Sequence, residues 1–188
     1  MLTPLDQYLL APLTFLTKNP HDFFKVCGGA VQFLSETCGS ELSLSNNNHW
    51  VEKTKRLGNF CKHSFVAINH DYNGVIILTL RSKGEYGHFY SSIGFFDPIG
   101  CLSNDYRSFT GVQITWCASS FVLRQSGKEE YHTDKIMEVD DMLIISFQDH
   151  YVTFALPSQD WSKTVPCEEN GILGIHLSLI DECWSIDN

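Results

Sequence analysis

The stretch Glu138–Phe154 reads Glu-Val-Asp-Asp-Met-Leu-Ile-Ile-Ser-Phe-Gln-Asp-His-Tyr-Val-Thr-Phe, and it decides the fold of this chain. Two apolar, β-prone runs flank a short polar turn at Gln148–His150, which predicts a β-hairpin. Pro157 follows the second run and is expected to end the strand pairing, because proline lacks an N–H donor. An isolated hairpin is only marginally stable in water, so this one requires further strands or a second sheet. The sequence therefore predicts a β-sheet scaffold.

Further β-prone segments, separated by turn residues, run through the rest of the chain. The β region is expected to begin near Trp50, an exposed turn is expected at Ser126–Glu130, and Trp161 is expected in a loop that extends to Gly171. Because no βαβ alternation appears, the pattern predicts a mostly β fold, an antiparallel two-sheet β-sandwich or a barrel. The predicted strands cover residues 64–69, 75–80, 88–96, 112–116, 120–124, 142–147, 151–155, 173–179 and 183–186.

The first 45 residues have a different pattern. Apolar side chains at helical spacing predict a helix near the start, and a second helix is expected from Pro20, resuming over residues 30–34. A polar stretch that includes Asn46–Asn48 predicts a linker or long loop. We therefore expect a short α-helical N-terminal segment over 1–45, which packs on the core or mediates a homodimer, and a β-sandwich domain over 46–188. The helical spacing comes from Leu5, Tyr8, Leu9, Leu13 and Leu16.

Composition argues against several classes of function. The chain has 13 Lys and Arg against 22 Asp and Glu, a formal charge of −9, so nucleic acid is not an expected partner. No run approaches the roughly 18 apolar residues of a membrane span, and the N-terminus lacks the features of a secretory signal, so no membrane association is expected. The seven cysteines, an odd number without a CxxC pair, favour free thiols in a reducing, cytoplasmic compartment.

Candidate catalytic and metal-binding residues do not combine into a recognisable site. The pairs Asp140–Asp141 and Glu168–Glu169 cannot converge on one atom, because adjacent residues in a strand point to opposite faces. The run Cys61–His63 with His70 lacks the second knuckle of a structural zinc site. No local motif marks Cys117 as an activated nucleophile. We therefore expect no catalytic residue, no metal and no cofactor.

Aromatic and arginine residues in predicted loops are the candidates for binding a partner. Tyr, Trp and Arg are enriched at interface hot spots, and loops on a rigid scaffold often carry recognition. An alternative interpretation is that these aromatic side chains fold back and plug the ends of the sandwich. The candidate partner-binding residues are Tyr86, Asp105, Tyr106, Arg107 and Trp161.

The order of these segments resembles the SPRY domain, the core of the B30.2 module, over about residues 50 to 186. Asn73–Leu80 resembles the family's glycine-containing turn into a strong strand, and Ser92–Phe95 resembles its strand ending in Ile-Gly. Ser120–Phe121, followed by Ser126–Lys128, resembles a later strand and its exposed Gly-Lys turn.

The chain departs from the family pattern around the hairpin. Val139–Ile144 only partly matches the family's start of this hairpin, since Asp140 stands where the family has glycine. Leu156–Asp160 replaces the usual Asn-Gly after the second strand. The resemblance implies a bent two-sheet sandwich without catalytic residues. It also implies that variable loops bind a peptide or protein partner, often within a ubiquitin-ligase or signalling assembly.

These observations favour a non-catalytic protein–protein interaction module, acting as a substrate-recruiting or signalling adaptor. Two alternatives stay open. The first is a carbohydrate-binding, lectin-like sandwich in which an exposed tryptophan stacks on a sugar beside Asn104 and Arg107. The second is a cysteine hydrolase that uses Cys61 or Cys117.

Overall fold

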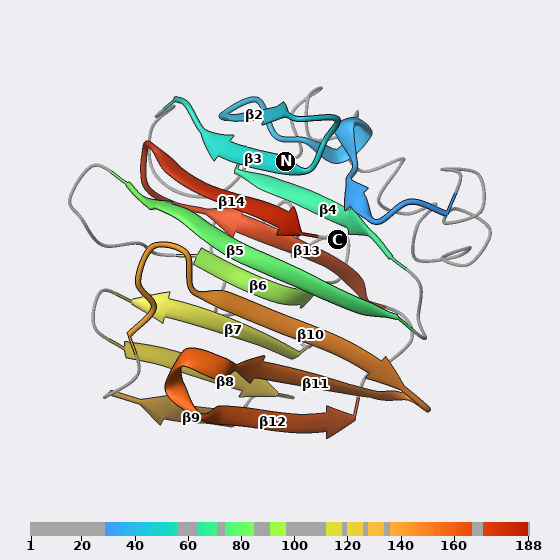
Figure 1. Cartoon of the computed structure of the whole chain (residues 1–188), viewed down its shortest axis with the longest axis vertical. Helices are drawn as coiled ribbons and strands as arrows, with labels where there is room; N and C mark the ends of the chain where they lie inside the picture. The colour runs from blue at the N-terminus through green and yellow to red at the C-terminus, as the bar shows by residue number, and fades with distance from the viewer. Residues whose placement is uncertain are drawn as a thin grey trace, which may run out of the picture.

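The computed structural model describes residues 29–55, 64–70, 74–84, 91–96, 112–117, 120–125, 128–133, 136–166 and 171–187. Within these ranges the chain forms two seven-stranded sheets that pack face to face (Figure 1). The first sheet has the strand order β1-β4-β13-β6-β7-β8-β9, and the second has the order β12-β11-β10-β5-β14-β3-β2. Neighbouring strands run antiparallel in both sheets, which confirms the predicted β-sandwich.

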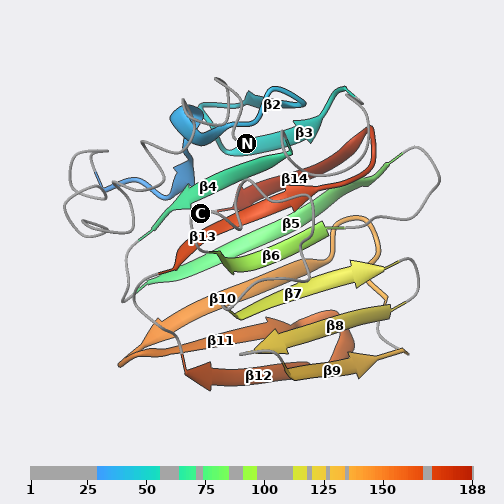
Figure 2. The same cartoon turned by 180° about the vertical axis from the view of Figure 1, so that it is seen from behind.

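The first sheet, which is nearer the viewer in Figure 2, contains β1 (Gln32–Phe33), β4 (Phe65–Asn69), β13 (Ile172–Leu177), β6 (Ser91–Phe96), β7 (Val112–Cys117), β8 (Ser120–Gln125) and β9 (Lys128–His132). The second sheet contains β12 (Trp161–Pro166), β11 (Tyr151–Leu156), β10 (Met142–Gln148), β5 (Val75–Lys83), β14 (Glu182–Asp187), β3 (Trp50–Lys53) and β2 (Leu42–Ser45). The part of the chain that the structure describes also contains the short 3-10 helices η1 (Ser35–Thr37) and η3 (Pro157–Gln159).

Strands β10 and β11 form the predicted hairpin. Gln148 pairs with Tyr151, so the turn consists of Asp149 and His150, whose φ angles are 45° and 67°. A two-residue turn with both residues in the left-handed region matches the twist of the strands it joins. Strand β11 ends at Leu156, and Pro157 begins η3, as the missing N–H of proline predicts.

The predicted helix over residues 30–34 is wrong, because Gln32–Phe33 forms β1 and pairs with β4. The side chain of Phe33 is fully buried, and its backbone N–H donates to Asn48 at 2.9 Å. Burial of a large aromatic side chain stabilises the fold by about 2–3 kcal/mol, more than the differences in helix propensity within so short a segment. The helices predicted within residues 1–28 lie outside the described residues.

The asparagine run predicted as a linker or long loop connects two strands of the second sheet. Ser45 pairs with Trp50, and Asn46, Asn47 and Asn48 between them have φ angles of 50°, 54° and 64°. Asparagine tolerates this left-handed conformation better than most residues. Strands of the sandwich therefore lie on both sides of the boundary expected near residue 46.

The region from Trp161 is a strand, which corrects the loop expected there. Strand β12 pairs with β11 along its length, from Leu156 opposite Trp161 to Tyr151 opposite Pro166. Asp160, with φ 48°, turns the chain back after η3, and Val165 of β12 is buried. The turn expected at Ser126–Glu130 is likewise shorter than predicted, because β9 begins at Lys128.

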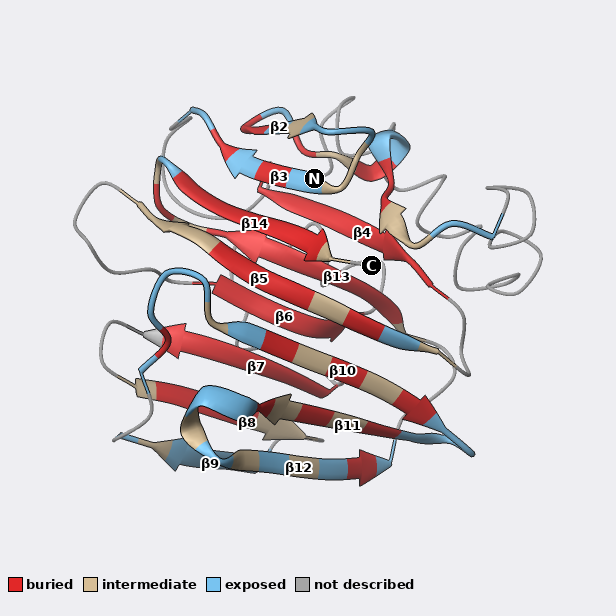
Figure 3. Cartoon of the chain, viewed as in Figure 1, coloured by how far each residue is buried: buried red, intermediate tan, exposed pale blue. Residues whose placement is uncertain are grey.

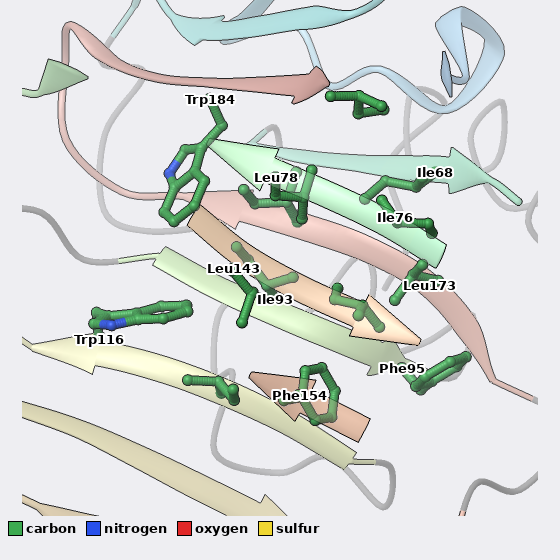
Figure 4. Close-up of a cluster of buried hydrophobic side chains, with 14 of the residues drawn as sticks. Ile68, Ile76, Leu78, Ile93, Phe95, Trp116, Leu143, Phe154, Leu173 and Trp184 are labelled. Atoms are coloured by element: carbon green, nitrogen blue, oxygen red, sulfur yellow. The ribbon is translucent and has the colours of Figure 1, made fainter. Parts of the chain in front are cut away.

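The hydrophobic core lies between the two sheets (Figure 4). Trp116 of β7 and Trp184 of β14 come from opposite sheets, and their ring centroids lie 5.7 Å apart. Both tryptophans are at most 2% exposed, so they belong to the core, as their strand positions predict. The core residues labelled in Figure 4 are Ile68, Ile76, Leu78, Ile93, Phe95, Trp116, Leu143, Phe154, Leu173 and Trp184.

Candidate functional site

The two sheets differ in how far their outer faces are exposed. On β4, β13, β6 and β7 of the first sheet, the described side chains that alternate with the core residues, and so point away from the core, are nevertheless at most 5% exposed, whereas Tyr131 of the edge strand β9 is 63% exposed; the buried ones include Phe65, Asn69, Phe96, Gln113 and His176. Figure 3 shows β4, β13 and β6 buried along their whole length, whereas β5, β10 and β11 alternate between buried and more exposed residues. A partner can reach only exposed side chains, so the outer face of the second sheet offers more accessible surface than the centre of the first sheet.

The centre of this exposed face is apolar. Val75 of β5, Met142 of β10 and Tyr151 of β11 are 59%, 41% and 51% exposed. Ile77 and Ala155 flank Ile144 on the neighbouring strands, so these three partly exposed side chains form a row across the sheet. Exposed apolar side chains that gather on one face are a feature of interaction sites. We call this set the apolar patch; it consists of Val75, Ile77, Met142, Ile144, Tyr151 and Ala155.

A network of hydrogen bonds around Arg81 borders the apolar patch. Nη2 of Arg81 donates to both carboxylate oxygens of Asp187, at 2.9 and 2.8 Å, and Nη1 donates to Oδ1 of Asp140 at 2.9 Å. Nε donates to Oγ of Ser185 at 2.8 Å. The ring of Trp50, on β3, lies 5.6 Å from Cζ of Arg81, within cation–π range. These contacts fix the guanidinium in one orientation.

The same contacts shift the ionisation of the two central groups. Burial raises the pKa of Asp187, but hydrogen bonds from Thr79, Ser185 and Arg81 outweigh it and hold that pKa below its ordinary value. Burial lowers the pKa of Arg81, but its bonds to Asp140 and Asp187 outweigh this and raise it. The pair is therefore charged at neutral pH.

The border of the patch carries more negative than positive charge. Lys83 forms a 2.6 Å ion pair with Glu138, whose side chain is 71% exposed. The side chain of Asp140 is 73% exposed, although Arg81 donates to it. Because both side chains are exposed, these carboxylates are accessible to a partner, and exposed ion pairs of this kind typically contribute less than about 1 kcal/mol to stability.

Trp161 closes one end of the sandwich. Its ring lies 4.8 Å from that of Phe121 and 5.4 Å from that of His132, and it is only partly exposed. Lys163 of β12 forms a 2.9 Å ion pair with Glu130 of β9 and so joins the edges of the two sheets nearby. This geometry is the plugging arrangement weighed as the alternative for the predicted loop aromatics. The other predicted partner-binding residues, Tyr86, Asp105, Tyr106 and Arg107, lie outside the described residues.

Sequence reasoning missed the exposed face of the second sheet. Along β10, Met142, Ile144 and Ser146 are more exposed than the buried residues between them, so the strand alternates between an exposed and a buried face. The sequence, however, has apolar residues on both faces of β5 and β10, and such a pattern equally suits a strand buried on both sides. The Arg81 network links segments far apart in the sequence, which single-sequence periodicity cannot detect.

A buried cluster at the other end of the second sheet combines a lysine, a serine and a carboxylate. Nζ of Lys53 lies 2.7 Å from both Oε2 of Glu41 and Oγ of Ser64, and Ser64 donates to Glu41 at 2.7 Å. Lysine can serve as the base for a serine nucleophile in some hydrolases. Here Ser64 is 0% exposed and Lys53 is 3% exposed, so a substrate has no access to the hydroxyl. Lys53 also donates to the carbonyl of Leu177 on the first sheet, at 3.1 Å, which makes the cluster a link between the sheets.

A second buried carboxylate links the sheets near Trp184. Glu182 of β14 accepts hydrogen bonds from the hydroxyl of Ser91 on β6 and, at 3.3 Å, from the backbone N–H of Leu179. Nε1 of Trp184 donates to Oγ of Ser91 at 3.0 Å. Partners on several sides satisfy the carboxylate, as burial of a charged group requires.

The thiols of Cys38 and Cys183 are not activated. Burial raises the pKa of Cys38 to about 11, and burial is also the main cause that raises the pKa of Cys183 to about 11. A thiol in this state is a weak nucleophile at neutral pH. Of the two cysteines considered as nucleophiles, Cys117 ends β7 and Cys61 lies outside the described residues.

No group of three or more His, Cys, Asp or Glu residues within the described ranges could hold a metal ion. His70, considered as a ligand with Cys61–His63, is buried and its ring stacks on Phe147 with a centroid distance of 4.7 Å. Among the residues that the structure describes, no helix has the length and apolar character needed to cross a membrane.

Comparisons with known proteins match this chain at the level of structure. No protein-family model matches the sequence, and no curated protein is similar to it in sequence. The crystal structure of the TRIM65 PSpry domain is similar, with a TM-score of 0.58 and 11% sequence identity, over 84% of this chain and 90% of that chain. The structure of stonustoxin is similar with a TM-score of 0.57 and 13% identity, over 84% of this chain and 28% of that chain.

At this level of identity, the comparisons establish the fold and leave the partner open. The two packed antiparallel sheets and their similarity to the PSpry structure agree with the resemblance seen in the sequence. The fold of this chain is that of a SPRY-like, or B30.2-like, domain.

Proposed function

We propose that this chain is a non-catalytic interaction domain that binds a polypeptide partner through the exposed face of the second sheet. The observation that carries the proposal is the difference between the two outer faces: the centre of one is buried, and the other presents the apolar patch beside the Arg81 network. The SPRY-like fold supports it, because SPRY domains generally act as protein-interaction modules. A substrate-recruiting or signalling adaptor in the cytoplasm is the role that we propose for it.

The exposed face has the physical properties of a binding surface. Trp, Tyr and Arg dominate the hot spots of protein interfaces, and the face presents Trp50, Tyr151 and Arg81. Arg81 is already fixed by its hydrogen bonds to Asp187, Asp140 and Ser185, so a partner that contacts it causes little further loss of side-chain entropy. The β-sheet beneath these side chains is a rigid support.

An affinity purification with one variant and one control tests the proposal. Lysine at both Val75 and Met142 places charge in the apolar patch, whereas Tyr131→Lys changes a side chain that is 63% exposed on β9 of the first sheet. We expect the wild-type chain and Tyr131→Lys to recover the same partner from a cytosolic extract, and Val75→Lys/Met142→Lys to lose it. Recovery of that partner by a folded double variant would refute the proposal.

Other expectations from the sequence remain predictions with their own tests. The loop residues Tyr86, Asp105, Tyr106 and Arg107 form a second candidate surface, which alanine variants in the same purification test. Light scattering tests the homodimer expected through the N-terminal segment. Binding to a glycan array tests the lectin-like alternative, and labelling of Cys61 or Cys117 by thiol-reactive activity probes tests the cysteine hydrolase.

A further inference from the structure

We infer that the partner segment is extended and positively charged, with a Lys or Arg close to two alternating apolar side chains. This inference rests on the proposed function, since it specifies the partner for the same surface. It follows from the charge at the border of the apolar patch and from the spacing of side chains along β10.

The charge at the border is negative. Described carboxylates on or beside this face include those of Glu52, Glu138, Asp140, Asp141, Asp149 and Asp187, and the cations at the same border are Arg81 and Lys83. Arg81 is engaged by Asp187 and Asp140, and Lys83 is engaged by Glu138, so neither cation offers an unneutralised charge. A partner with basic side chains is complementary to this border, and complementarity of charge fixes the choice and register of a partner.

The spacing along β10 sets the pattern of the partner. Strand β10 begins beside a β-bulge, because the N–H of Asp140 donates to Leu80 at 2.8 Å, Leu80 donates to Asp141 at 3.1 Å, and Asp140 has a left-handed φ of 71°. Met142 and Ile144 alternate along β10 on the exposed face, and the hydrogen bond from Nη1 of Arg81 holds the carboxylate of Asp140 at the border of that face. Alternate residues of a strand lie about 6.5–7 Å apart, and an extended partner presents its own alternate side chains at the same interval. A partner with apolar side chains over Met142 and Ile144 then has a basic side chain close to Asp140.

A second copy of this chain is the less suitable occupant. The chain has a formal charge of −9, and a dimer formed by two copies of this face would bring two acidic borders into one interface. Like charges that meet across an interface oppose association by several kcal/mol. A different polypeptide of opposite charge avoids this repulsion, so charge favours a heterologous partner.

The test is a selection from a display library of random twelve-residue peptides against the wild-type chain. Enriched peptides are then synthesised, and their dissociation constants are measured by fluorescence polarisation. We expect the enriched sequences to contain Lys or Arg together with two apolar residues at alternate positions, with Asp and Glu depleted. Their association rates should fall as salt is added, because screening weakens attraction between exposed charges.

Matched variants separate the two parts of the surface. Asp140 has a left-handed φ of 71°, which asparagine tolerates, so Asp140→Asn removes the charge and keeps the backbone. We expect Asp140→Asn to weaken binding several-fold and Met142→Lys to weaken it by about tenfold or more, the effect of an interface hot spot. Glu36→Gln, which changes an exposed carboxylate on η1, and Tyr131→Lys should leave the dissociation constant unchanged.

The outcomes distinguish the inference from the proposed function. Peptides that bind through Met142 but carry no basic residue, or that bind Asp140→Asn as tightly as the wild type, would overturn the inference and leave the proposed function in place. Peptides that bind Met142→Lys as tightly as the wild type would contradict both. A library that yields no sequence with higher affinity for the wild type than for the Val75→Lys/Met142→Lys variant would also contradict both.

Discussion

Replacement of Lys53 by methionine should be among the most destabilising single substitutions in this domain. Lys53 is 3% exposed and donates to three acceptors, which lie on Glu41, Ser64 and Leu177. Methionine has a similar volume but no donor, so the substitution leaves the carboxylate of Glu41 buried without its cation. Loss of one partner of a buried ion pair typically lowers the free energy of unfolding by about 3–5 kcal/mol.

The loss is large compared with the total stability expected of such a domain, about 5–15 kcal/mol. For a chain of this size each kcal/mol shifts Tm by about 2–4 °C, so we expect a decrease of about 6–20 °C. Urea unfolding followed by tryptophan fluorescence measures the change as a lower midpoint with an unchanged slope, since Trp116 and Trp184 are both buried.

The double variant Glu41→Leu/Lys53→Met provides the control for Lys53→Met. Removal of both charges should restore part of the lost stability, because the uncompensated carboxylate is then absent. Two results would show that the cluster does not stabilise the fold as an ion pair between the sheets. The first is a loss of less than about 1 kcal/mol in the free energy of unfolding for Lys53→Met. The second is a loss for the double variant that equals the sum of the losses for the two single variants.

Four further predictions concern packing, pH and the edges of the sandwich. Gly174→Ala should lower the free energy of unfolding by several kcal/mol, because the added Cβ would lie 2.4 Å from Cζ of Phe65 and 2.7 Å from the carbonyl oxygen of Val66. Thermal unfolding measures this loss, and an unchanged Tm would contradict the prediction. At neutral pH the wild type should be more stable than Asp187→Asn. This difference in the free energy of unfolding should disappear as the pH falls from about 3.8, the ordinary pKa of Asp, through the lower pKa of Asp187 in the folded state. Urea titrations across this pH range measure the difference, and a constant value would refute the prediction. Trp161→Ala should cost about 2–4 kcal/mol, less than a fully buried tryptophan, because Trp161 packs on Phe121 and His132 but is partly exposed; a loss below about 0.5 kcal/mol would mean that it does not close the sandwich end. Met142→Lys should change stability by no more than about 0.5 kcal/mol, because Met142 is 41% exposed, and circular dichroism during heating tests this.

Much of the β-sandwich could be predicted from the sequence, because strand and turn signals are local. The hairpin of β10 and β11 follows from the apolar runs around Gln148–His150, and its turn residues adopt the left-handed conformation that such a short connection requires. Phe33 shows where local reasoning fails. Its segment has a helical pattern, but a position in the core between the sheets determines its conformation, and that position depends on strands far away in the sequence.

The exposed face of the second sheet could not be predicted from the sequence for the same reason. Asp140 and Asp187 lie 59 and 106 residues away from Arg81 along the chain, and the pairing of β5 with β10 and β14 brings the three together. Nor does the sequence indicate which sheet has a covered outer face. For Trp161, by contrast, the sequence predicts a partner-binding residue in a loop. It does not predict the strand that places Trp161 against Phe121 and His132.

Hydroxyl-radical footprinting of the chain with and without a bound partner peptide tests the central claim most directly. Hydroxyl radicals modify exposed Met, Tyr and Trp side chains, and the face of the second sheet presents Met142, Tyr151 and Trp50, which are 41%, 51% and 37% exposed. If this face binds the partner, the peptide will protect these three side chains and leave Tyr131, on the first sheet, unchanged. Protection confined to other parts of the chain, with Met142 and Tyr151 modified as fast as in the free protein, would contradict the claim.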